Sequence, residues 1–346
     1  MDIGPMVSMA DVAQAAGVHQ TTVSRALRND RRISAAKRRQ IRALADKLGY
    51  RPHPLISALV AVRRQRRPPR FEATIAYVAS VQRDPTSDDL YIEGARSAVA
   101  RLGYRLDVFR LGEEGLTAPR LNAILRARNV YGLIIGALAR RGENFVLSWR
   151  QYCIVTIEYT FSRPEFDRVV HDCYAGMRDI MQACRRAGRR RVGLLLSIVA
   201  DERTERLFSA AYGVEQAADA FFAPIPPLIQ PDWDEAAFAI WRRRYRPEVI
   251  VTSNAFLPQV QAWCDAKGIV IGRDVHLANV NTFQFGRIAG VAQNPRVIGA
   301  AAARMVVDKI LNNDRGIPAV RLTVLTPGRW MNGSSFCAKR GSRERA

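Results

Sequence analysis

The chain has 346 residues, 48% of them hydrophobic, and a formal net charge of +21 at pH 7. This length allows a small domain joined to a large two-lobed one, and no run of about 18 apolar residues predicts a membrane-spanning helix. The five cysteines are scattered and never spaced as CxxC, which predicts reduced, mostly buried thiols and no zinc site: Cys153, Cys173, Cys184, Cys264 and Cys337.

Positive charge is concentrated at the N-terminal end. Residues 1–70 hold 15 Lys and Arg against 4 Asp and Glu, which is +11 of the net +21. Such a region attracts polyanions by counterion release and predicts salt-sensitive binding to DNA. The remaining +10, mostly Arg, predicts a second cationic surface that the sequence does not assign. No hydrophobic signal segment is visible, so we expect a cytoplasmic protein.

Three short helices are predicted at the start of the chain. The first opens with the capping box Ser8-Met9-Ala10-Asp11 and ends at Gly17, a residue that tolerates the left-handed backbone of a sharp turn. The second begins at His19 or Gln20. The third runs from Ser34 to Leu48 and stops before Gly49 and Pro52. Two helices around a tight turn, packed by a third, are typical of a DNA-reading unit.

The second of these helices has two distinct faces. Its apolar residues Val23, Ala26 and Leu27 lie at helical spacing. The opposite face carries Gln20, Thr21, Ser24 and Arg25. Arg pairs with guanine, Gln with adenine, and Ser or Thr with either, in the major groove. A polar face alone is more often an ordinary solvated surface, but the three-helix setting favours base reading.

Four segments resemble the headpiece of the lac-repressor and galactose-repressor (LacI/GalR) family of bacterial transcription regulators: Asp11-Val12-Ala13, Ala16-Gly17-Val18, Thr22-Val23-Ser24-Arg25-Ala26-Leu27 and Leu48-Gly49-Tyr50-Arg51-Pro52. The resemblance implies that Gln20, Thr21 and Arg25 hold the main base-reading positions and that Asn29 lies near the phosphate backbone. His19 stands where the family usually has a capping Ser, so it either weakens the cap or itself contacts DNA. The expected DNA-binding set is Ser8, His19, Gln20, Thr21, Ser24, Arg25, Asn29 and Leu59.

The segment that follows the headpiece resembles the family's hinge helix, which folds when two subunits meet over the operator. Within His53 to Val62, Leu59 aligns with a leucine that family members insert into the minor groove. Such a wedge unstacks a base step and bends the duplex. The alternative role of Leu59 is packing between two hinge helices. The basic run from Arg63 to Arg70 is either a solvated linker or a source of phosphate contacts.

From Phe71 onward, short apolar runs alternate with amphipathic stretches. This alternation predicts parallel sheets with right-handed crossovers. The expected strands are Ala73 to Ser80, Tyr104 to Phe109, Val130 to Gly136, Tyr152 to Ile157, Arg191 to Ile198, Glu248 to Ser253 and Asp274 to Val280. The expected helices are Asp89 to Leu102, Ala118 to Ala127, Tyr174 to Arg186, Thr204 to Ala218, Ala255 to Ala266 and Pro295 to Leu311. No GxGxxG or GxxxxGK[ST] motif indicates a nucleotide site, and no cofactor is expected.

This region resembles the periplasmic-binding-protein-like core of the same regulators, an α/β domain in which two lobes with parallel sheets enclose a small ligand. Asp172 to Gly176 resembles the entry into the second lobe, and Gly290 to Pro295 the return to the first. Loops at the carboxyl ends of parallel strands line such clefts. The implied domains are a helix-turn-helix headpiece at 8–52, a hinge helix and basic linker at 53–70, and a two-lobed effector-binding and dimerisation domain at 71–336.

The resemblance places seven residues in the cleft: Ser80, Glu158, Arg206, Trp233, Asn254, Asn281 and Gln293. An indole, amides and a carboxylate suit a sugar or related polyol. Trp233 is equally well explained as packing at a helix start. Asn254 and Asn281 stand where sugar-responsive relatives often carry Asp, which puts a familiar sugar effector in doubt. For the family's effector-binding Arg, Arg203 is an alternative to Arg206, and Phe208 a further candidate for the position.

These patterns together predict a homodimeric regulator, most simply a repressor, that binds a near-palindromic operator on double-stranded DNA and a small-molecule effector. An enzyme is disfavoured because the four histidines are dispersed and no GxSxG nucleophile elbow is present. A solute-binding protein would need export and would not need the headpiece. A basic architectural protein without sequence preference is the main alternative, because of the charge of +21.

Overall fold

The computed structural model describes residues 9–27, 30, 32–48, 73–80, 85–282 and 286–337. The chain divides into two compact units, residues 1–70 and 71–346, which are described separately. Four features expected from the sequence lie outside the described residues: Ser8, Asn29, the hinge segment with Leu59, and the basic run 63–70.

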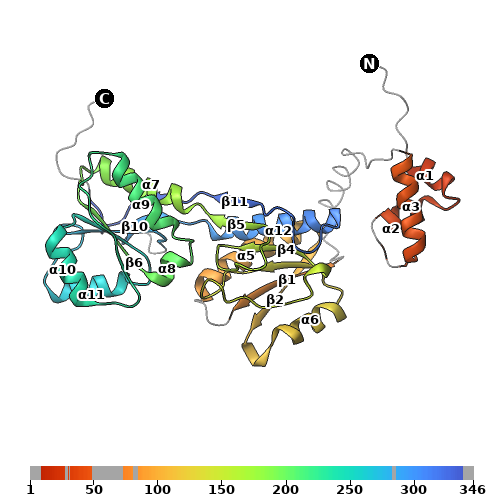
Figure 1. Cartoon of the computed structure of the whole chain (residues 1–346), viewed down its shortest axis with the longest axis horizontal. Helices are drawn as coiled ribbons and strands as arrows, with labels where there is room; N and C mark the ends of the chain where they lie inside the picture. The colour runs from red at the N-terminus through yellow and green to blue at the C-terminus, as the bar shows by residue number, and fades with distance from the viewer. Residues whose placement is uncertain are drawn as a thin grey trace, which may run out of the picture. The chain divides into compact units, whose positions relative to one another are not determined.

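The first unit is a three-helix bundle of α1 (Met9–Ala15), α2 (Gln20–Leu27) and α3 (Ala35–Lys47), as expected (Figure 1). Gly17 has φ +60° in the turn between α1 and α2, the backbone region that favours glycine. The hydroxyl of Ser34 caps α3 by accepting from the Lys37 amide at 3.3 Å. The core takes two residues from each helix: Val12, Ala13, Val23, Ala26, Ile41 and Ala45.

The second unit has two lobes, each built on a six-stranded sheet. All neighbouring strands of the first sheet are parallel. Its order is β11 (Thr323–Thr326), β5 (Arg168–His171), β4 (Cys153–Ile157), β3 (Gly132–Ile135), β1 (Ala73–Ser80) and β2 (Tyr104–Leu111). The second sheet is parallel except for the antiparallel pair of β10 and β12 at one edge. Its order is β12 (Arg329–Met331), β10 (Ala289–Ala292), β9 (His276–Asn279), β8 (Val249–Thr252), β6 (Val192–Ser197) and β7 (Leu228–Gln230).

Helices cover both faces of each sheet. The first lobe carries α5 (Pro85–Arg101), α6 (Ala118–Ala127) and α12 (Pro295–Asn312). The second carries α7 (Cys173–Arg186), the short α8 (Ile198–Glu202), α9 (Leu207–Ala218), α10 (Glu235–Tyr245) and α11 (Leu257–Ala266). Each lobe therefore has two apolar layers. In the first lobe α5 and α12 pack on one face, and α6 on the other. In the second, α7 and α9 oppose α10 and α11.

The chain crosses between the lobes three times, from β5 to α7, from β10 to α12 and from β11 to β12. These crossings confirm the expected two-lobed fold. All seven expected strands are present, but β5, β7, β10, β11 and β12 were not predicted, and neither were the helices α8 and α10. The missed strands lie at crossings between the lobes or at sheet edges, where pairing partners decide the structure.

Two other expectations can be compared with the structure. All five cysteines are free thiols, four of them buried, and Cys337 is exposed. In the part of the chain that the structure describes, no helix has the length and hydropathy needed to cross a membrane, and no group of His, Cys, Asp and Glu is arranged to hold a metal ion.

Candidate nucleic-acid interface and ligand cleft

The polar face of α2 is a surface supported by a rigid core. Gln20, Thr21 and Arg25 are exposed and Ser24 is half-buried, whereas Val23 and Ala26 are fully buried. One helix face thus packs against α1 and α3 while the other presents hydrogen-bonding groups to solvent. Because the buried face fixes the helix, the exposed groups keep a fixed spacing, as base recognition requires.

His19 serves as the cap of α2. Its ring atom Nδ1 accepts from the Thr21 amide at 3.3 Å and lies 2.9 Å from Thr21 Oγ1. Its carbonyl oxygen accepts from the Thr22 amide at 2.8 Å. The imidazole therefore performs the task that a Ser hydroxyl usually performs at a helix start. A direct contact of His19 with DNA stays a prediction.

Basic side chains of α3 hold the connection from α2 to α3. Arg38 Nη1 donates to the carbonyl oxygens of Asp30 at 3.1 Å and Ile33 at 2.7 Å. Arg42 Nη2 donates to the Leu27 carbonyl at 3.2 Å. Hydrogen bonds from Arg32 hold the pKa of Asp30 near 2. In the sequence these arginines appear only as charge, because their carbonyl partners are set by the fold.

In the second unit, the residues expected to bind ligand follow the carboxyl ends of several strands. Ser80 is the last residue of β1, and its side chain is outside the description. Glu158 follows β4, and Gln293, half-buried, follows β10. Asn254 and Asn281 follow β8 and β9 in the second lobe. Parallel topology thus brings them to the edges of the two sheets where clefts form.

Glu158 is the carboxylate of this set, and its position is fixed by two hydrogen bonds. Its backbone has φ 61°, in the left-handed region. The Tyr91 hydroxyl donates to Oε1 at 3.0 Å, and the His171 amide donates to Oε2 at 3.4 Å. The half-buried carboxylate is therefore held at the start of the β4–β5 loop.

A network of three asparagines joins the ends of β8 and β9. Asn279 Nδ2 donates to Asn254 Oδ1 at 2.5 Å, and Asn254 Nδ2 donates to the Asn281 carbonyl at 3.1 Å. Asn279 Oδ1 accepts from the Asn281 amide at 2.9 Å. The structure thus brings the two expected amides together through Asn279, a buried residue that sequence reasoning missed because it lies within a strand.

Four buried side-chain oxygens near this edge of the second sheet lack a hydrogen-bond partner among the described residues: Asp201 Oδ1, Gln230 Oε1, Ser253 Oγ and Asn281 Oδ1. Buried polar atoms are normally satisfied, so these oxygens suit a bound molecule or water that presents donors. Burial raises the pKa of Asp201, although Ser209 donates to its other oxygen. Only Asn281 was expected from the sequence. The other three were missed, although each ends or closely follows a strand.

Trp233 lies in the aromatic core of the second lobe. Its ring centroid is 5.0 Å from that of Phe238 and 5.8 Å from that of Phe256. Asp234, which follows it, caps α10 by accepting from the Ala237 amide at 2.9 Å. The packing role considered for Trp233 is therefore present, and stacking on a ligand stays a prediction. Phe208 is likewise buried in the core, only 4% exposed.

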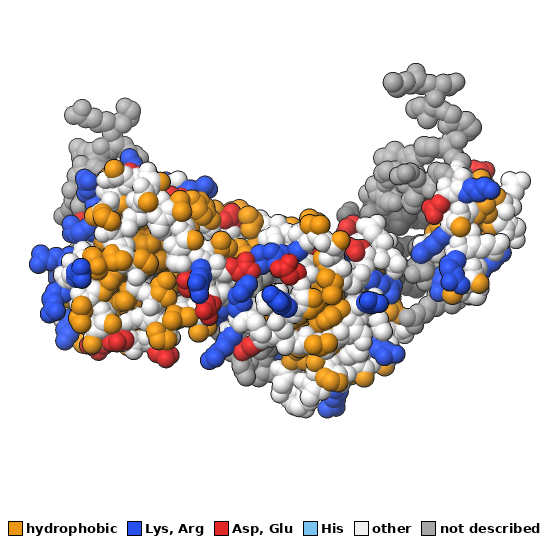
Figure 2. Space-filling view, viewed as in Figure 1, with side chains coloured by type: hydrophobic (Ala, Val, Ile, Leu, Met, Phe, Trp, Pro, Cys, Tyr) orange, Lys and Arg blue, Asp and Glu red, His pale blue; other side chains and the backbone are white. Residues whose placement is uncertain are grey.

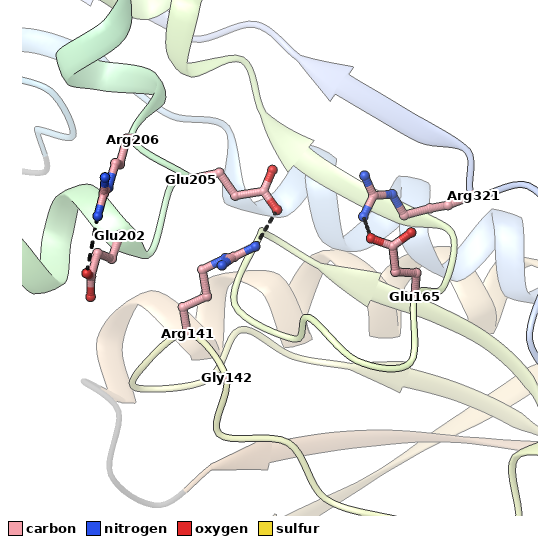
Figure 3. A pocket seen from close by; sticks show the side chains of 7 residues that line it. All are labelled: Arg141, Gly142, Glu165, Glu202, Glu205, Arg206 and Arg321. Carbon is pink, nitrogen blue, oxygen red and sulfur yellow. Dashed lines mark hydrogen bonds and ion pairs between the residues drawn. The ribbon is translucent and has the colours of Figure 1, made fainter.

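Arg206 immediately precedes α9 in the second lobe. It has φ 62°, its side chain is 72% exposed, and it pairs with Glu202 at 3.8 Å. It lines a cavity of about 630 Å³ whose other lining residues come from both lobes (Figure 3). The lining residues are Arg141, Gly142, Glu165, Glu202, Glu205, Arg206 and Arg321.

Beside this cavity an ionic cluster, here called the interlobe clasp, joins the lobes. Arg168 donates to Glu205 from Nη1 at 3.0 Å and from Nη2 at 3.2 Å, and Arg141 Nη2 donates to Glu205 at 3.1 Å. Arg168 is also held over the ring of Tyr159 at 4.5 Å. Burial raises the pKa of Glu205, but hydrogen bonds and charge from Arg168 and Arg141 outweigh it, so the net pKa is lowered. The clasp was not predicted, because its members are 37 and 64 residues apart.

At the first crossing, His171 ends β5 and is fully buried. Both of its ring nitrogens lack a hydrogen-bond partner within the described ranges. Burial lowers the pKa of His171 to about 4, so the ring is neutral at pH 7. Its ring packs against Phe208 of the second lobe, with centroids 6.3 Å apart. The connection between the lobes therefore contains an uncharged imidazole whose protonation is costly.

Comparison with family models gives two matches. Residues 8–53 match the bacterial regulatory proteins of the lacI family. Residues 180–336 match a periplasmic binding protein-like domain. The first match covers the helix-turn-helix bundle and the second covers the lobe that holds the asparagine network.

Two curated relatives are similar over part of the chain. The HTH-type transcriptional regulator PtxS of Pseudomonas plecoglossicida is 29% identical over 164 residues, 47% of this chain and 46% of the relative. The HTH-type transcriptional regulator GalR of Streptococcus thermophilus is 30% identical over 104 residues, 30% of this chain and 29% of the relative. The aligned part therefore spans less than half the length of either relative.

Solved structures share the fold over most of the chain. The transcriptional regulator CelR in complex with cellobiose has a TM-score of 0.57 at 19% identity, covering 94% of this chain and 98% of that one. The lac repressor dimer bound to operator and the anti-inducer ONPF has a TM-score of 0.57 at 15% identity, covering 96% and 100%. At these identities the likeness concerns the fold.

Proposed function

Because the chain belongs to the LacI family of bacterial regulatory proteins, we propose that it is a sequence-specific DNA-binding transcription regulator whose operator affinity changes when a small molecule binds between the two lobes. The observation that carries this proposal is the polar face of α2, where Gln20, Thr21 and Arg25 are exposed above a buried apolar face. Repression is the simplest outcome, since a bound regulator blocks access to the DNA that it covers.

The proposed binding unit is a homodimer on a near-palindromic operator. Two headpieces place their α2 helices in successive major grooves, and two-fold symmetry in the protein matches two-fold symmetry in the site. Leu59, outside the described residues, is proposed as the wedge that bends the operator at its centre. The lac repressor dimer bound to operator, a fold neighbour, supports this arrangement. Such a protein acts where the chromosome is, in the cytoplasm, and needs no catalytic step.

For the effector we propose a small polyhydroxylated molecule. The second lobe offers acceptors at Asp201, Gln230 and Asn281, and a hydroxyl group at Ser253. Hydroxyl groups of a sugar can donate to such acceptors, and Glu158 on the first lobe adds another. The cellobiose complex of CelR supports a sugar-like ligand. Binding to both lobes would shift their relative orientation, a coupling typically worth about 1–3 kcal/mol.

Selection of bound duplexes from a random pool, followed by titration of the selected and a scrambled duplex, tests the DNA-binding proposal. A sequence-specific regulator favours its site by roughly 10³ or more at moderate salt. Equal affinity for the two duplexes would instead identify the basic architectural protein that the charge of +21 also allows. Repeating the titration with a library of sugars and polyols tests the effector. Turnover of any of them by the purified protein would contradict a purely regulatory role.

A further inference from the structure

The topology of the second lobe brings two arginine-rich segments to one edge of its sheet. Helix α7 ends just before β6, and α10 ends just before β8. Strands β6 and β8 are parallel neighbours with Val192 opposite Val249. The segments before them, 185–191 and 242–248, therefore lie side by side at the amino-terminal edge of the sheet. This edge is opposite the one that carries the asparagine network.

Direct hydrogen bonds connect the two segments. Arg191 Nε donates to the Arg246 carbonyl at 2.8 Å. The amides of Arg190 and Arg191 donate to Glu248 Oε2 at 2.9 and 3.1 Å. These bonds join the ends of both crossover helices into one surface.

Seven exposed arginines form this surface, which we call the basic pole: Arg185, Arg186, Arg190, Arg191, Arg243, Arg244 and Arg246. Within the described residues, its carboxylate partners are Asp219, paired with Arg185, and Glu248, 3.9 Å from Arg191. Seven guanidinium groups thus face two carboxylates. Lys and Arg side chains gather along the outer edge of this lobe beside α10 (Figure 2). The pole accounts for part of the cationic surface that the sequence left unassigned.

Aromatic rings hold some of these guanidinium groups in place. Phe221 lies beneath both Arg185, at 5.4 Å, and Arg190, at 5.2 Å. Arg244 lies over the ring of Tyr245 at 5.4 Å. A cation–π contact uses the flat face of the guanidinium group, whereas its N–H donors lie on the edge. Stacking therefore lowers the entropy that these side chains lose on binding an oxyanion and leaves the geometry for bidentate contact intact.

Helix capping explains only part of the pole. Cations in the last turns of α7 and α10 stabilise the helix dipoles, which accounts for Arg185, Arg186, Arg243 and Arg244. Arg190 and Arg191 lie beyond the end of α7, where the dipole no longer requires a positive charge. The stacking of Arg190 on Phe221 is likewise unrelated to capping.

The composition of the pole favours a polyphosphate over a protein. In the part of the chain that the structure describes, none of the exposed large hydrophobic side chains belongs to segments 185–191 or 242–248. Protein interfaces usually centre on buried apolar and aromatic residues, whereas contacts to a nucleic-acid backbone are polar and strongly positive. Arginine also matches the geometry of a phosphate better than lysine does.

We propose that the basic pole binds the phosphate backbone of duplex DNA, as a second DNA site beyond the helix-turn-helix headpiece. A molecule that holds its operator through the headpieces then binds another duplex segment through its second lobes. The contact is independent of sequence and weakens steeply with salt, because it rests on counterion release. This site acts in addition to the proposed function and does not depend on the effector.

The test uses the full chain saturated with unlabelled selected operator and titrated with a fluorescein-labelled duplex of random sequence. Anisotropy should report binding of the second duplex to the wild type. The variant with Arg186→Gln, Arg190→Gln, Arg243→Gln and Arg244→Gln should bind it at least tenfold more weakly, with unchanged affinity for the operator. The log–log slope of its affinity against salt should fall by about 0.9 for each phosphate group that the variant no longer binds.

A matched variant removes the same charge from exposed sites on the first lobe: Arg101→Gln, Arg120→Gln, Arg126→Gln and Arg150→Gln. The proposal expects little change for this control. Equal losses in the two variants, or no second-duplex binding by the wild type, would overturn it. Tighter binding of poly-L-glutamate than of duplex would overturn it too, in favour of an acidic protein partner. Loss of operator preference with second-duplex binding retained would instead count against the proposed function alone.

Discussion

The headpiece and the candidate ligand site, here called the cleft, are built from contacts of very different sequence range. In α2, the expected base-reading residues lie within six positions, and His19 bonds Thr21 two residues away. In the cleft, Asn254 bonds Asn281 across 27 residues, and Tyr91 bonds Glu158 across 67. A local surface follows from helical spacing alone, whereas a cleft exists only once two sheets have formed. The face of α2 can therefore be predicted from local periodicity, whereas the cleft depends on how distant segments come together in the fold.

The largest effect should appear in the second unit when the pH is lowered. His171 has its pKa reduced from 6.5 to about 4 by burial. Between pH 6.5 and 4, His171 is protonated in the unfolded chain but stays neutral in the folded chain. The free energy of unfolding should therefore fall over this range and then level off. The loss attributable to this group is about 3 kcal/mol.

Replacement of His171 by Phe, a ring without a titratable nitrogen, should remove most of this pH dependence. Denaturant unfolding followed by tryptophan fluorescence measures it, because all five tryptophans lie in the second unit. The headpiece lacks tryptophan, so the fluorescence change reports the second unit alone. If the His171→Phe variant still loses the full unfolding free energy between pH 6.5 and 4, the pH dependence comes from another group.

The interlobe clasp should give a smaller effect on stability. Glu205→Gln removes the charge facing Arg168, which is only 8% exposed, and should weaken the second unit by about 1–2 kcal/mol at pH 7. Because the pKa of Glu205 is lowered, its contribution is complete above the ordinary value of 4.5 and is lost as the pH falls through the lowered pKa.

The difference in unfolding free energy between wild type and Glu205→Gln should therefore shrink in acid. Glu202→Gln is a suitable control, since Glu202 is half exposed and pairs with Arg206 at 3.8 Å. Equal destabilisation by both substitutions would show that the clasp adds nothing beyond an ordinary surface pair.

The smallest expected effect concerns the cap of α2. His19→Ala removes the acceptor for the Thr21 amide and should cost the headpiece about 1 kcal/mol. His19→Ser supplies a hydroxyl acceptor and should restore most of that stability. Thermal unfolding of the two variants, followed by helical circular dichroism, distinguishes these outcomes. Identical melting of both variants would mean that the imidazole is not acting as a cap.

Sequence reasoning found most of the fold. The helices of the headpiece and seven strands follow from spacing and from glycine and proline positions. The five strands that were missed have three or four residues each and lie at crossings or sheet edges, where pairing partners decide the structure. Helix α10 was missed although Asp234 is a good capping residue, because its Arg-rich last turns obscure its apolar face.

The cleft was predicted less completely than the headpiece. Asn254 and Asn281 were expected and do come together, but Asn279, which joins them, looks like an ordinary strand residue in the sequence. Arg206 was expected at the ligand site by resemblance, and it lines a cavity between the lobes together with the clasp residue Glu205. Partners across lobes leave no local pattern, so only the folded chain reveals them.

The measurement that bears most directly on the central claim is a base-substitution scan of the operator with the wild type and with Arg25→Ala. Binding is measured to the selected operator and to its variants with each base pair changed in turn. If α2 reads the major groove, changing one symmetric pair of base positions should cost the wild type about 1–3 kcal/mol of binding free energy. In the Arg25→Ala protein, changes at this pair should have no effect on binding, whereas changes at all other positions should have the same effect as in the wild type. Arg39→Ala, which removes another exposed charge on α3, should leave the pattern intact. An unchanged pattern for Arg25→Ala would contradict the assignment of α2 as the DNA-reading helix.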